Sequence, residues 1–389
     1  MKSVRQTLVA LGAASLLFSI PPAFAKCPVS DGATVKINAP IGNLQVDTNG
    51  RDAVEVEVNS KDIEVREICA KDRAEYTAVA PGQIRSSIDW KIVVPRNVNL
   101  DLVTNGGSIR LVGDSDGWAT LRTSGGSVTV GNIKGRTAII TQGGFIKAGN
   151  IGESAELRSS SAGSIEVANI GGNADLHTAG GSITTGVVNG KVKADSAGGG
   201  IYIKGARDEV VVTAESNIFI GDALRINAKS VGGNITNPKN RGPFKGETDS
   251  GDIRLESAGG WVEASTGFGS IYVKLNPVSI TDDLHITLQS GVGDISIYIP
   301  ERLKGVIEAT IERPALTARR IFSDFPMIGG EPVSQALANN PRARGIVSPP
   351  RGNGFTSQES QRAVLNGGGA NAIKLHTSLG KIEIFKIKL

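Results

Sequence analysis

Apolar and polar residues alternate in short runs along most of the chain. Ile109-Arg-Leu111, Val128-Thr-Val130 and Ile253-Arg-Leu255 are typical runs. A period of two with many β-branched residues predicts strands that bury one face. Segments such as Gly131-Asn-Ile133 separate the runs, and their glycine and asparagine favour tight turns. The pattern therefore predicts an all-β protein of short strands joined at corners.

The strands recur in a repeated unit: a hydroxyl residue, two spacers, a glycine, one spacer and a β-branched residue. The first copy reads Thr104-Asn-Gly-Gly107-Ser-Ile109, and later copies follow at steps of 17 to 19 residues as far as Thr266. We place the hydroxyl residue of the fourth copy at Ser160 and that of the seventh at Thr213. One unit cannot bury its apolar row alone, whereas stacked units can. The repeat thus predicts a β-solenoid with coils of about 18 residues.

Each position of the unit has an expected structural role. The glycines are expected at one corner of each coil, at Gly107, Gly126, Gly144, Gly163, Gly181, Gly199, Gly233, Gly251, Gly269, Gly293 and Gly380. The β-branched residues are expected in the core, at Ile109, Val128, Ile146, Ile165, Ile183, Ile201, Ile218, Ile235, Ile253, Ile271, Ile295 and Ile382. A bulky residue at a corner is expected to cost ~1–2 kcal/mol by forcing a left-handed backbone. The hydroxyl residues are expected to bond backbone groups of neighbouring coils.

Residues 1–25 have the pattern of a secretory signal peptide. Lys2 and Arg5 precede a short apolar run and an Ala-x-Ala site, so we expect cleavage after Ala25. The apolar run is shorter than a membrane span needs. We therefore expect an exported chain, periplasmic or at the cell surface, with no transmembrane segment after signal cleavage.

The remaining chain divides into four parts. Residues 26–103 are strand-rich but less regular, and we expect an N-terminal cap with antiparallel character that closes the open edge of the solenoid. The solenoid repeats span residues 104–312. Residues 313–369 are rich in proline and glycine and locally basic, which predicts a long, partly disordered loop. Strands in residues 370–389 are expected to complete the far end of the sheet.

Cys27 and Cys69 are the two cysteines of the chain. In an oxidising compartment such a pair predicts a disulfide, worth ~2–4 kcal/mol. The pair lacks the CxxC spacing of a redox or metal site.

The sequence offers no constellation typical of an enzyme. The histidines have no metal-ligand spacing; they are His177, His285 and His376. Outward positions carry no constant row of acids, which a polysaccharide-cleaving β-helix would need. The carboxylates that could approach each other are Glu166 with Asp175 and Asp249 with Asp252. We therefore predict no catalytic, metal-binding or cofactor-binding residues, no cofactor and no enzymatic activity.

The net charge and the number of aromatic residues indicate which kinds of binding partner can be expected. Loss of Lys2 and Arg5 lowers the formal net charge from +4 to +2, which gives no reason to expect nucleic acid. Aromatic residues are scarce, so a stacking platform for sugars would depend on Trp118, Trp261, Tyr202, Phe219 or Tyr272, of which the tryptophans are expected to fill corners. The expected partner is an envelope component, a polysaccharide or a second copy of the chain.

The arrangement resembles the adhesin family of exported bacterial β-strand-repeat proteins, also called toastrack domains. The resemblance rests on the Thr-x-Gly-Gly-Ser-Ile repeats, on Trp90-Lys-Ile-Val-Val-Pro95 before Leu100-Asp-Leu-Val-Thr104, and on Ser323-Asp-Phe-Pro326 followed by Asn366-Gly-Gly-Gly369. It implies a β-solenoid related to right-handed single-stranded β-helices, placed outside the cytoplasmic membrane. It supplies no catalytic residues.

The hypothesis that combines these observations is a non-catalytic exported cell-envelope protein, an adhesin or scaffold that presents its repeat β surface for binding. One alternative is a carbohydrate-active β-helix enzyme acting on a polysaccharide, for which longer coils and an acidic cleft would be expected. A second alternative is a sensor partner in an envelope-stress pathway that signals through residues 313–369.

Overall fold

The computed structural model describes residues 26–60, 63–79, 88–277, 279, 283–313, 320–328 and 358–388. The predicted signal peptide at 1–25 and most of the predicted loop at 313–369 lie outside these residues. The described chain is built from β-strands, which confirms the all-β prediction. Among its residues, no helix has the length and hydropathy of a membrane span.

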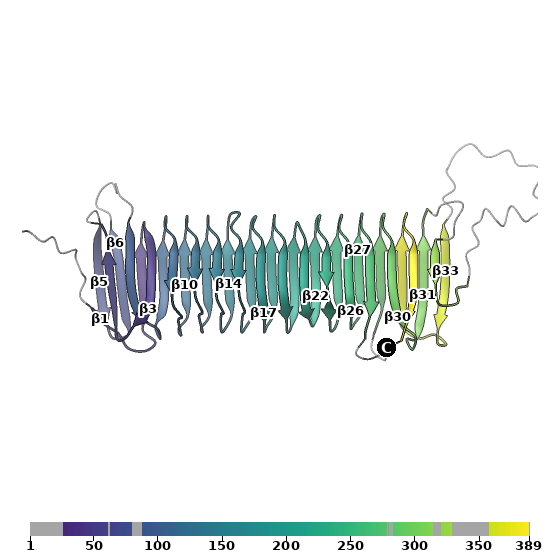
Figure 1. Cartoon of the computed structure of the whole chain (residues 1–389), viewed down its shortest axis with the longest axis horizontal. Coiled ribbons are helices and arrows are strands. Elements are labelled where there is room, and N and C mark those ends of the chain that lie inside the picture. Colours follow the sequence, from purple (N-terminus) through teal and green to yellow (C-terminus); the bar gives the residue numbers. More distant parts are fainter. Residues whose placement is uncertain are drawn as a thin grey trace, which may run out of the picture.

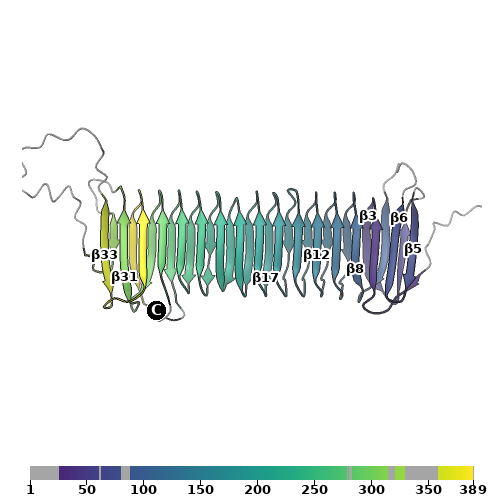
Figure 2. The same cartoon turned by 180° about the vertical axis from the view of Figure 1, so that it is seen from behind.

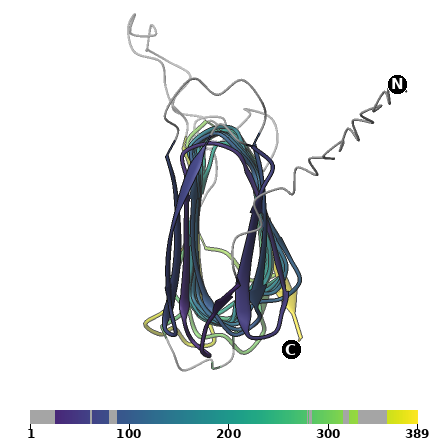
Figure 3. The same cartoon turned by 90° about the vertical axis from the view of Figure 1, so that its left-hand side faces the viewer.

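Two sheets of mainly parallel strands form the walls of a long, flattened tube. Figures 1 and 2 show its two sides, and Figure 3 shows it along its length. Each regular coil gives one strand to each sheet, and each strand pairs in parallel with the equivalent strand one coil away. The β-solenoid predicted from the repeat is therefore the observed fold.

The strands of both sheets follow chain order in the middle of the tube but not at its ends. Sheet 1 consists, in spatial order, of β5 (Glu64–Ala70), β6 (Arg73–Val79), β2 (Thr34–Ala39), β8 (Asn99–Thr104), β10 (Ala119–Thr123), β12 (Thr137–Thr141), β14 (Ala155–Ser159), β16 (Ala174–Thr178), β18 (Val192–Ser196), β20 (Glu209–Ala214), β22 (Arg225–Ser230), β25 (Phe244–Thr248), β27 (Val262–Thr266), β29 (Ile286–Ser290), β34 (Ala372–Thr377), β31 (Gly305–Ile311) and β33 (Glu359–Leu365). Sheet 2 consists of β1 (Cys27–Pro28), β4 (Ala53–Val58), β7 (Asp89–Pro95), β3 (Asn43–Gly50), β9 (Ile109–Val112), β11 (Val128–Val130), β13 (Ile146–Ala148), β15 (Ile165–Val167), β17 (Ile183–Val188), β19 (Ile201–Ala206), β21 (Ile218–Ala223), β23 (Ile235–Asn237) with β24 (Lys239–Asn240), β26 (Ile253–Ala258), β28 (Ile271–Leu275), β30 (Ile295–Pro300), β35 (Ile382–Ile387) and β32 (Ile321–Ser323).

The residues predicted as the core row lie stacked on the inner side of sheet 2. Val128 pairs in register with Ile109 on one side and Ile146 on the other, and equivalent pairing continues to Ile295 and Ile382. Each of the predicted core residues is at most 1% exposed. Burial of such a side chain contributes about 1.5–3 kcal/mol, so this row is a main source of stability.

The corner glycines are required by close packing between coils. A Cβ on Gly126 would come 2.3 Å from the carbonyl oxygen of Gly107, and one on Gly144 would come 2.4 Å from that of Gly126. The glycines with a positive φ among the described residues lie elsewhere, for example at Gly42 and Gly113. The predicted left-handed backbone at the corners is therefore wrong, because the constraint comes from the neighbouring coil and not from the dihedral angle.

The hydroxyl row forms a ladder with these glycines. The Thr141 hydroxyl donates to the carbonyl of Gly126, one coil earlier, at 2.7 Å. The same oxygen accepts the backbone N–H of Gly144, its own corner glycine, at 3.1 Å. Thr178 makes the same pair of bonds with Gly163 and Gly181. Each of these two hydroxyls therefore satisfies one donor and one acceptor where two coils meet.

Two members of the predicted hydroxyl row were wrongly assigned. Ser159, not Ser160, lies in register with Thr141 and donates to Gly144, because this corner contains one extra residue. Ala214, not Thr213, occupies the row in the seventh copy. Thr213 faces water on the outer side of sheet 1. Ladder positions thus cannot be read where the corner length changes.

The N-terminal cap mixes parallel and antiparallel pairs. β2 and β3 each lie between two parallel partners, β6 and β8 in sheet 1 and β7 and β9 in sheet 2. β5 then pairs antiparallel with β6, and β4 with β7. Exposed charges such as Glu64 and Arg66 on the edge strand β5 disfavour pairing with another sheet.

The last strands of the chain lie inside the stack, not at its end. β34 pairs with both β29 and β31, and β35 with both β30 and β32. Figure 1 shows these yellow strands between green ones. β33 closes sheet 1 by pairing antiparallel with β31. The expectation that residues 370–389 complete the far end therefore has to be corrected.

The stretch predicted as a loop at 313–369 contains two strands, β32 and β33. β33 buries every second residue, but two of its inward residues are Glu359 and Gln361. Because polar residues fill inward positions, the alternation of apolar and polar residues is absent and the strand could not be recognised from the pattern.

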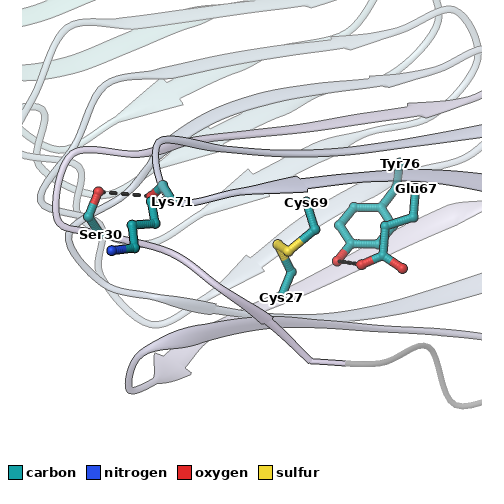
Figure 4. The surroundings of a disulfide bond; sticks show 6 residues. All are labelled: Cys27, Ser30, Glu67, Cys69, Lys71 and Tyr76. Carbon is teal, nitrogen blue, oxygen red and sulfur yellow. Dashed lines mark hydrogen bonds between the residues drawn. A yellow bond between two sulfur atoms is a disulfide. The ribbon is translucent and has the colours of Figure 1, made fainter.

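Cys27 and Cys69 form a disulfide that joins β1 to the edge strand β5 (Figure 4). Tyr76 lies nearby and is fully buried, and its hydroxyl donates to Glu67 Oε1 at 3.0 Å. Burial, together with the hydrogen bond to Glu67 and the charge of Glu67, raises the pKa of Tyr76. The cap is therefore tied together by one covalent bond and one buried phenol.

Candidate functional site

The outer face of sheet 2 carries one residue of each coil in a straight row. We call it the outer row; its members are Thr129, Lys147, Glu166, Thr184, Tyr202, Phe219, Thr236, Arg254, Tyr272, Ser296 and Glu383, paired in register. Neighbouring strands in a sheet lie about 4.8 Å apart. The row therefore presents one side chain to the surface about every 4.8 Å along the tube.

A shallow groove of about 550 Å³ runs beside the first part of the outer row. Gly149, Ala168 and Gly186 are part of its lining, and their small side chains leave room there. Gly149 and Gly186 are small of necessity, since a Cβ on either would come within 3 Å of the preceding coil. The close stacking of coils thus creates the groove.

Tyr202 and Phe219 lie at the end of the groove. Tyr202 and Lys204 are part of its lining. The rings of Tyr202 and Phe219 stack nearly in parallel, with centroids 4.7 Å apart. Tyr202 remains 45% exposed, so its ring is accessible. The groove therefore ends at an exposed aromatic surface.

A second aromatic cluster lies further along the same face. Tyr298 is tilted against Tyr272, with ring centroids 5.3 Å apart, and stacks on Phe385 at 4.7 Å. The guanidinium of Arg254 lies 4.1 Å from the centre of the Tyr272 ring, a cation–π contact. Burial, and then the charge of Glu256 and the neighbouring Tyr298, raises the pKa of Tyr272 above its ordinary value.

Several charges on this face are paired with each other. Lys147 Nζ lies 3.2 Å from Glu166 Oε2, beside the groove. Arg254 Nε lies 2.6 Å from Glu256 Oε1, and Asp222 contacts both Arg241, at 2.9 Å, and Lys239, at 3.5 Å. Exposed pairs of this kind contribute little stability. Lys204 and Lys274 also face outward, so the face is polar and has more cations than carboxylates.

The first pair of carboxylates considered for catalysis is divided between the two sheets. Glu166 lies on sheet 2, whereas Asp175 lies on sheet 1 and contacts Arg158 at 2.8 Å. Asp252 accepts the backbone N–H of Ser270 at 2.7 Å, as part of a row of such bonds at this corner. Asp175 and Asp252 therefore each make a contact that supports the fold.

The histidines lie in separate coils, each beside a carboxylate. His177 contacts Asp195, His285 contacts Asp283 and Glu263, and His376 contacts Glu312. Hydrogen bonds from His285 lower the pKa of Asp283. Within the described residues, the one group of three metal-ligating side chains close together is Cys27, Glu67 and Cys69, and its cysteines are used in the disulfide.

Trp118 and Trp261 stand at corners next to sheet 1, away from the outer row. Trp118 is 37% exposed just before β10. Trp261 precedes β27 and stacks on His285, with centroids 5.1 Å apart. Of the aromatic residues proposed from the sequence, the fold thus brings Tyr202 and Phe219 together and leaves the tryptophans apart.

Tyr298 and Phe385 were not recognised as surface residues from the sequence. Both occupy outward positions in Ile295-Ser-Ile-Tyr-Ile299 and Ile382-Glu-Ile-Phe385, so alternation alone would have placed them outside. Their proximity could not be inferred from the sequence. β35 pairs with β30, although four other strands, β31 to β34, lie between them in the chain.

Comparison with known proteins gives limited similarity. No family model matches the sequence, and no curated protein matches it. Among solved structures, the chain is similar to a putative cell adhesion protein from Clostridium sporogenes, with 10% identity, a TM-score of 0.17, and coverage of 92% of this chain and 94% of that one. It is also similar to a putative adhesin from Bacteroides fragilis, with 16% identity, a TM-score of 0.16, and coverage of 70% and 95%. Both names fall in the class that the repeat motifs resemble, but at these TM-scores the similarity carries no argument about this chain.

Proposed function

We propose that this chain is an exported, non-catalytic binding protein of the adhesin type, and that the outer face of sheet 2 binds a polysaccharide. The groove that ends at the stacked pair Tyr202 and Phe219 carries this proposal. The flat side of a sugar ring is apolar and its rim carries hydroxyl groups. The exposed aromatic rings can stack on the flat side of the sugar. Lys147, Glu166 and Thr184, along the same groove, can form hydrogen bonds with its hydroxyl groups.

The disulfide between Cys27 and Cys69 supports the export part of the proposal. Disulfides form and persist in oxidising compartments and are rare in the cytoplasm. The periplasm and the cell surface both meet this condition, and the pattern of residues 1–25 agrees with either.

The non-catalytic part of the proposal rests on the surroundings of the acidic groups. Glycoside cleavage needs two carboxylates on either side of one bond. Glu166, the acid beside the groove, has Lys147 as its partner, and the acid considered with it lies on the other sheet. We therefore expect binding without turnover.

A glycan-binding assay tests the proposal directly. Immobilised linear polysaccharides should retain the wild-type chain, and Tyr202→Ala should weaken binding roughly 10-fold or more, as loss of a central aromatic contact does. Phe268→Ala is the matched control, because Phe268 is 71% exposed at the corner between β27 and β28, outside the coils that line the groove. Binding of no glycan, equal loss in both variants, or release of new reducing ends from the polymer would contradict the proposal.

A further inference from the structure

We infer that Tyr272, Tyr298 and Phe385 form a second subsite for the same polymer, so that one polysaccharide chain lies along sheet 2 and contacts both aromatic clusters. This inference rests on the proposed function. It adds the size and shape of the ligand: a long, linear chain, bound at two points.

Tyr202 and Tyr272 lie on one line on the surface, and Tyr298 and Phe385 occupy the neighbouring outward row beside Tyr272. Tyr202 and Tyr272 belong to the same outer row, and the paired strands β19, β21, β23, β26 and β28 connect them. Four strand spacings of about 4.8 Å separate these tyrosines by roughly 19 Å. A chain that stacks on Tyr202 and continues parallel to the tube axis therefore reaches Tyr272.

The residues between the clusters suit a sugar chain. Thr236 and Arg254 occupy the outer row there, and both offer hydrogen-bond donors to hydroxyl groups. The length of a hexose unit in an extended chain is close to the strand spacing. Each coil can therefore meet one sugar, and a chain of roughly six sugars spans both clusters.

The second cluster has the composition of a stacking platform. Tyr298 and Phe385 stack with centroids 4.7 Å apart, as Tyr202 and Phe219 do. Arg254 lies against Tyr272 and is held by Glu256. Stacked rings fix each other's orientation, so they offer a preformed surface whose ordering cost on binding is small.

Charges along this face are only partly paired. Lys147 is paired with Glu166, Arg254 with Glu256, and Asp222 with both Lys239 and Arg241. Lys204 and Lys274 also face outward here. The aromatic rings, which can stack on any sugar ring, therefore carry the inference, and the cations add hydrogen-bond donors beside them.

A chain-length series on the full protein tests the inference. Neutral oligosaccharides of two to ten units are titrated by calorimetry against wild type, Tyr202→Ala, Tyr298→Ala and the double variant. The expected result for wild type is a rise in affinity of at least 10-fold once the chain reaches roughly six units, because the second contact becomes intramolecular. Tyr298→Ala should abolish this rise and leave the affinity of the shortest chains at Tyr202 unchanged, with one long chain bound per protein.

Two controls separate the causes of a loss. Tyr298→Phe keeps the ring and should retain at least half of the rise, and thermal unfolding reports whether each variant is folded. A rise that survives Tyr298→Ala, or two long chains bound per protein, would overturn the inference and leave the proposed function intact. Binding to a polyanion only, in a salt-sensitive manner, would show that cations and not the aromatic rings hold the chain, and would overturn the inference. Failure of wild type to bind any glycan would overturn both proposals.

Discussion

Glycine is required at each coil corner because the backbone of the neighbouring coil lies too close to leave room for a Cβ atom. Corners with two consecutive glycines show this, because only one of the two lies against the neighbouring backbone. A Cβ on Gly126 would come 2.3 Å from the Gly107 carbonyl oxygen, whereas one on the adjacent Gly125 would come no closer than 3.7 Å to its neighbours. The second glycine of the unit is thus a steric requirement, and the first is not.

Gly126→Ala should therefore destabilise the protein, and Gly125→Ala should not. Overpacking at Gly126 forces a local backbone shift with an expected cost of about 1–3 kcal/mol. Gly125→Ala is the matched control, expected to be neutral or slightly stabilising because it restricts the unfolded chain. Chemical denaturation of the three proteins measures the difference, and equal stability of both variants would contradict the steric explanation.

Tyr76 makes the cap sensitive to alkaline pH. Its folded-state pKa is raised above the ordinary value of 10.0 by burial and by Glu67. Its contribution to the free energy of unfolding is therefore fully present below about pH 10 and is lost as pH rises towards the raised pKa, because the unfolded chain ionises first.

Tyr76→Phe should remove the decrease in the free energy of unfolding that ionisation of Tyr76 causes at alkaline pH. The hydrogen-bond donor to Glu67 disappears, so the variant should be less stable at neutral pH but should lose less on going above pH 10. Unfolding curves recorded from pH 8 to pH 11 compare the two slopes. Identical alkaline slopes would show that another group is responsible.

At the scale of elements, both ends of the solenoid share one topology. At the N-terminal end, β2 and β3 lie between the regular coils and β6 and β7. At the C-terminal end, β34 and β35 lie between the regular coils and the outermost strands. The coil formed by β2 and β3 and the coil formed by β34 and β35 are thus each held between two others. Loss of either coil should also release the strands on its outer side.

Removal of residues 370–389 should accordingly unfold more than these residues. β31 and β32 pair with the stack through β34 and β35, and β33 pairs with β31. Amide hydrogen exchange should show loss of protection in β31 and β33 and full protection in central strands such as β16, because coils of a solenoid interact mainly with their neighbours. Retained protection in β31 would contradict this topology.

The elements that could be predicted from the sequence are those that obey the repeat. The spacing of Val128, Ile146 and Ile165 suffices to place them in one buried row. Ser160 was misplaced because its corner has one extra residue, and spacing alone cannot show where a corner lengthens. The position of Phe385 beside Tyr298 was not predictable, since it depends on strand pairing that departs from chain order.

At the scale of the whole molecule, stacking converts a sequence period into a spatial one. Each coil advances the chain by one strand spacing, so outward residues one period apart form the outer row along the tube. The groove, the two aromatic clusters and the ligand length inferred from them all depend on this register. If the coils were not stacked in order, none of these surfaces would exist.

Distance measurement between spin labels tests this register most directly. Thr129→Cys and Thr236→Cys place labels on two outer-row residues in β11 and β23, while the native cysteines are protected in their disulfide. Six strand spacings lie between these strands, so electron–electron double resonance should give one narrow distance distribution centred at about 29 Å, within the reach of the label side chains. A broad distribution, or a maximum well away from this value, would contradict the stacked solenoid and the binding face built on it.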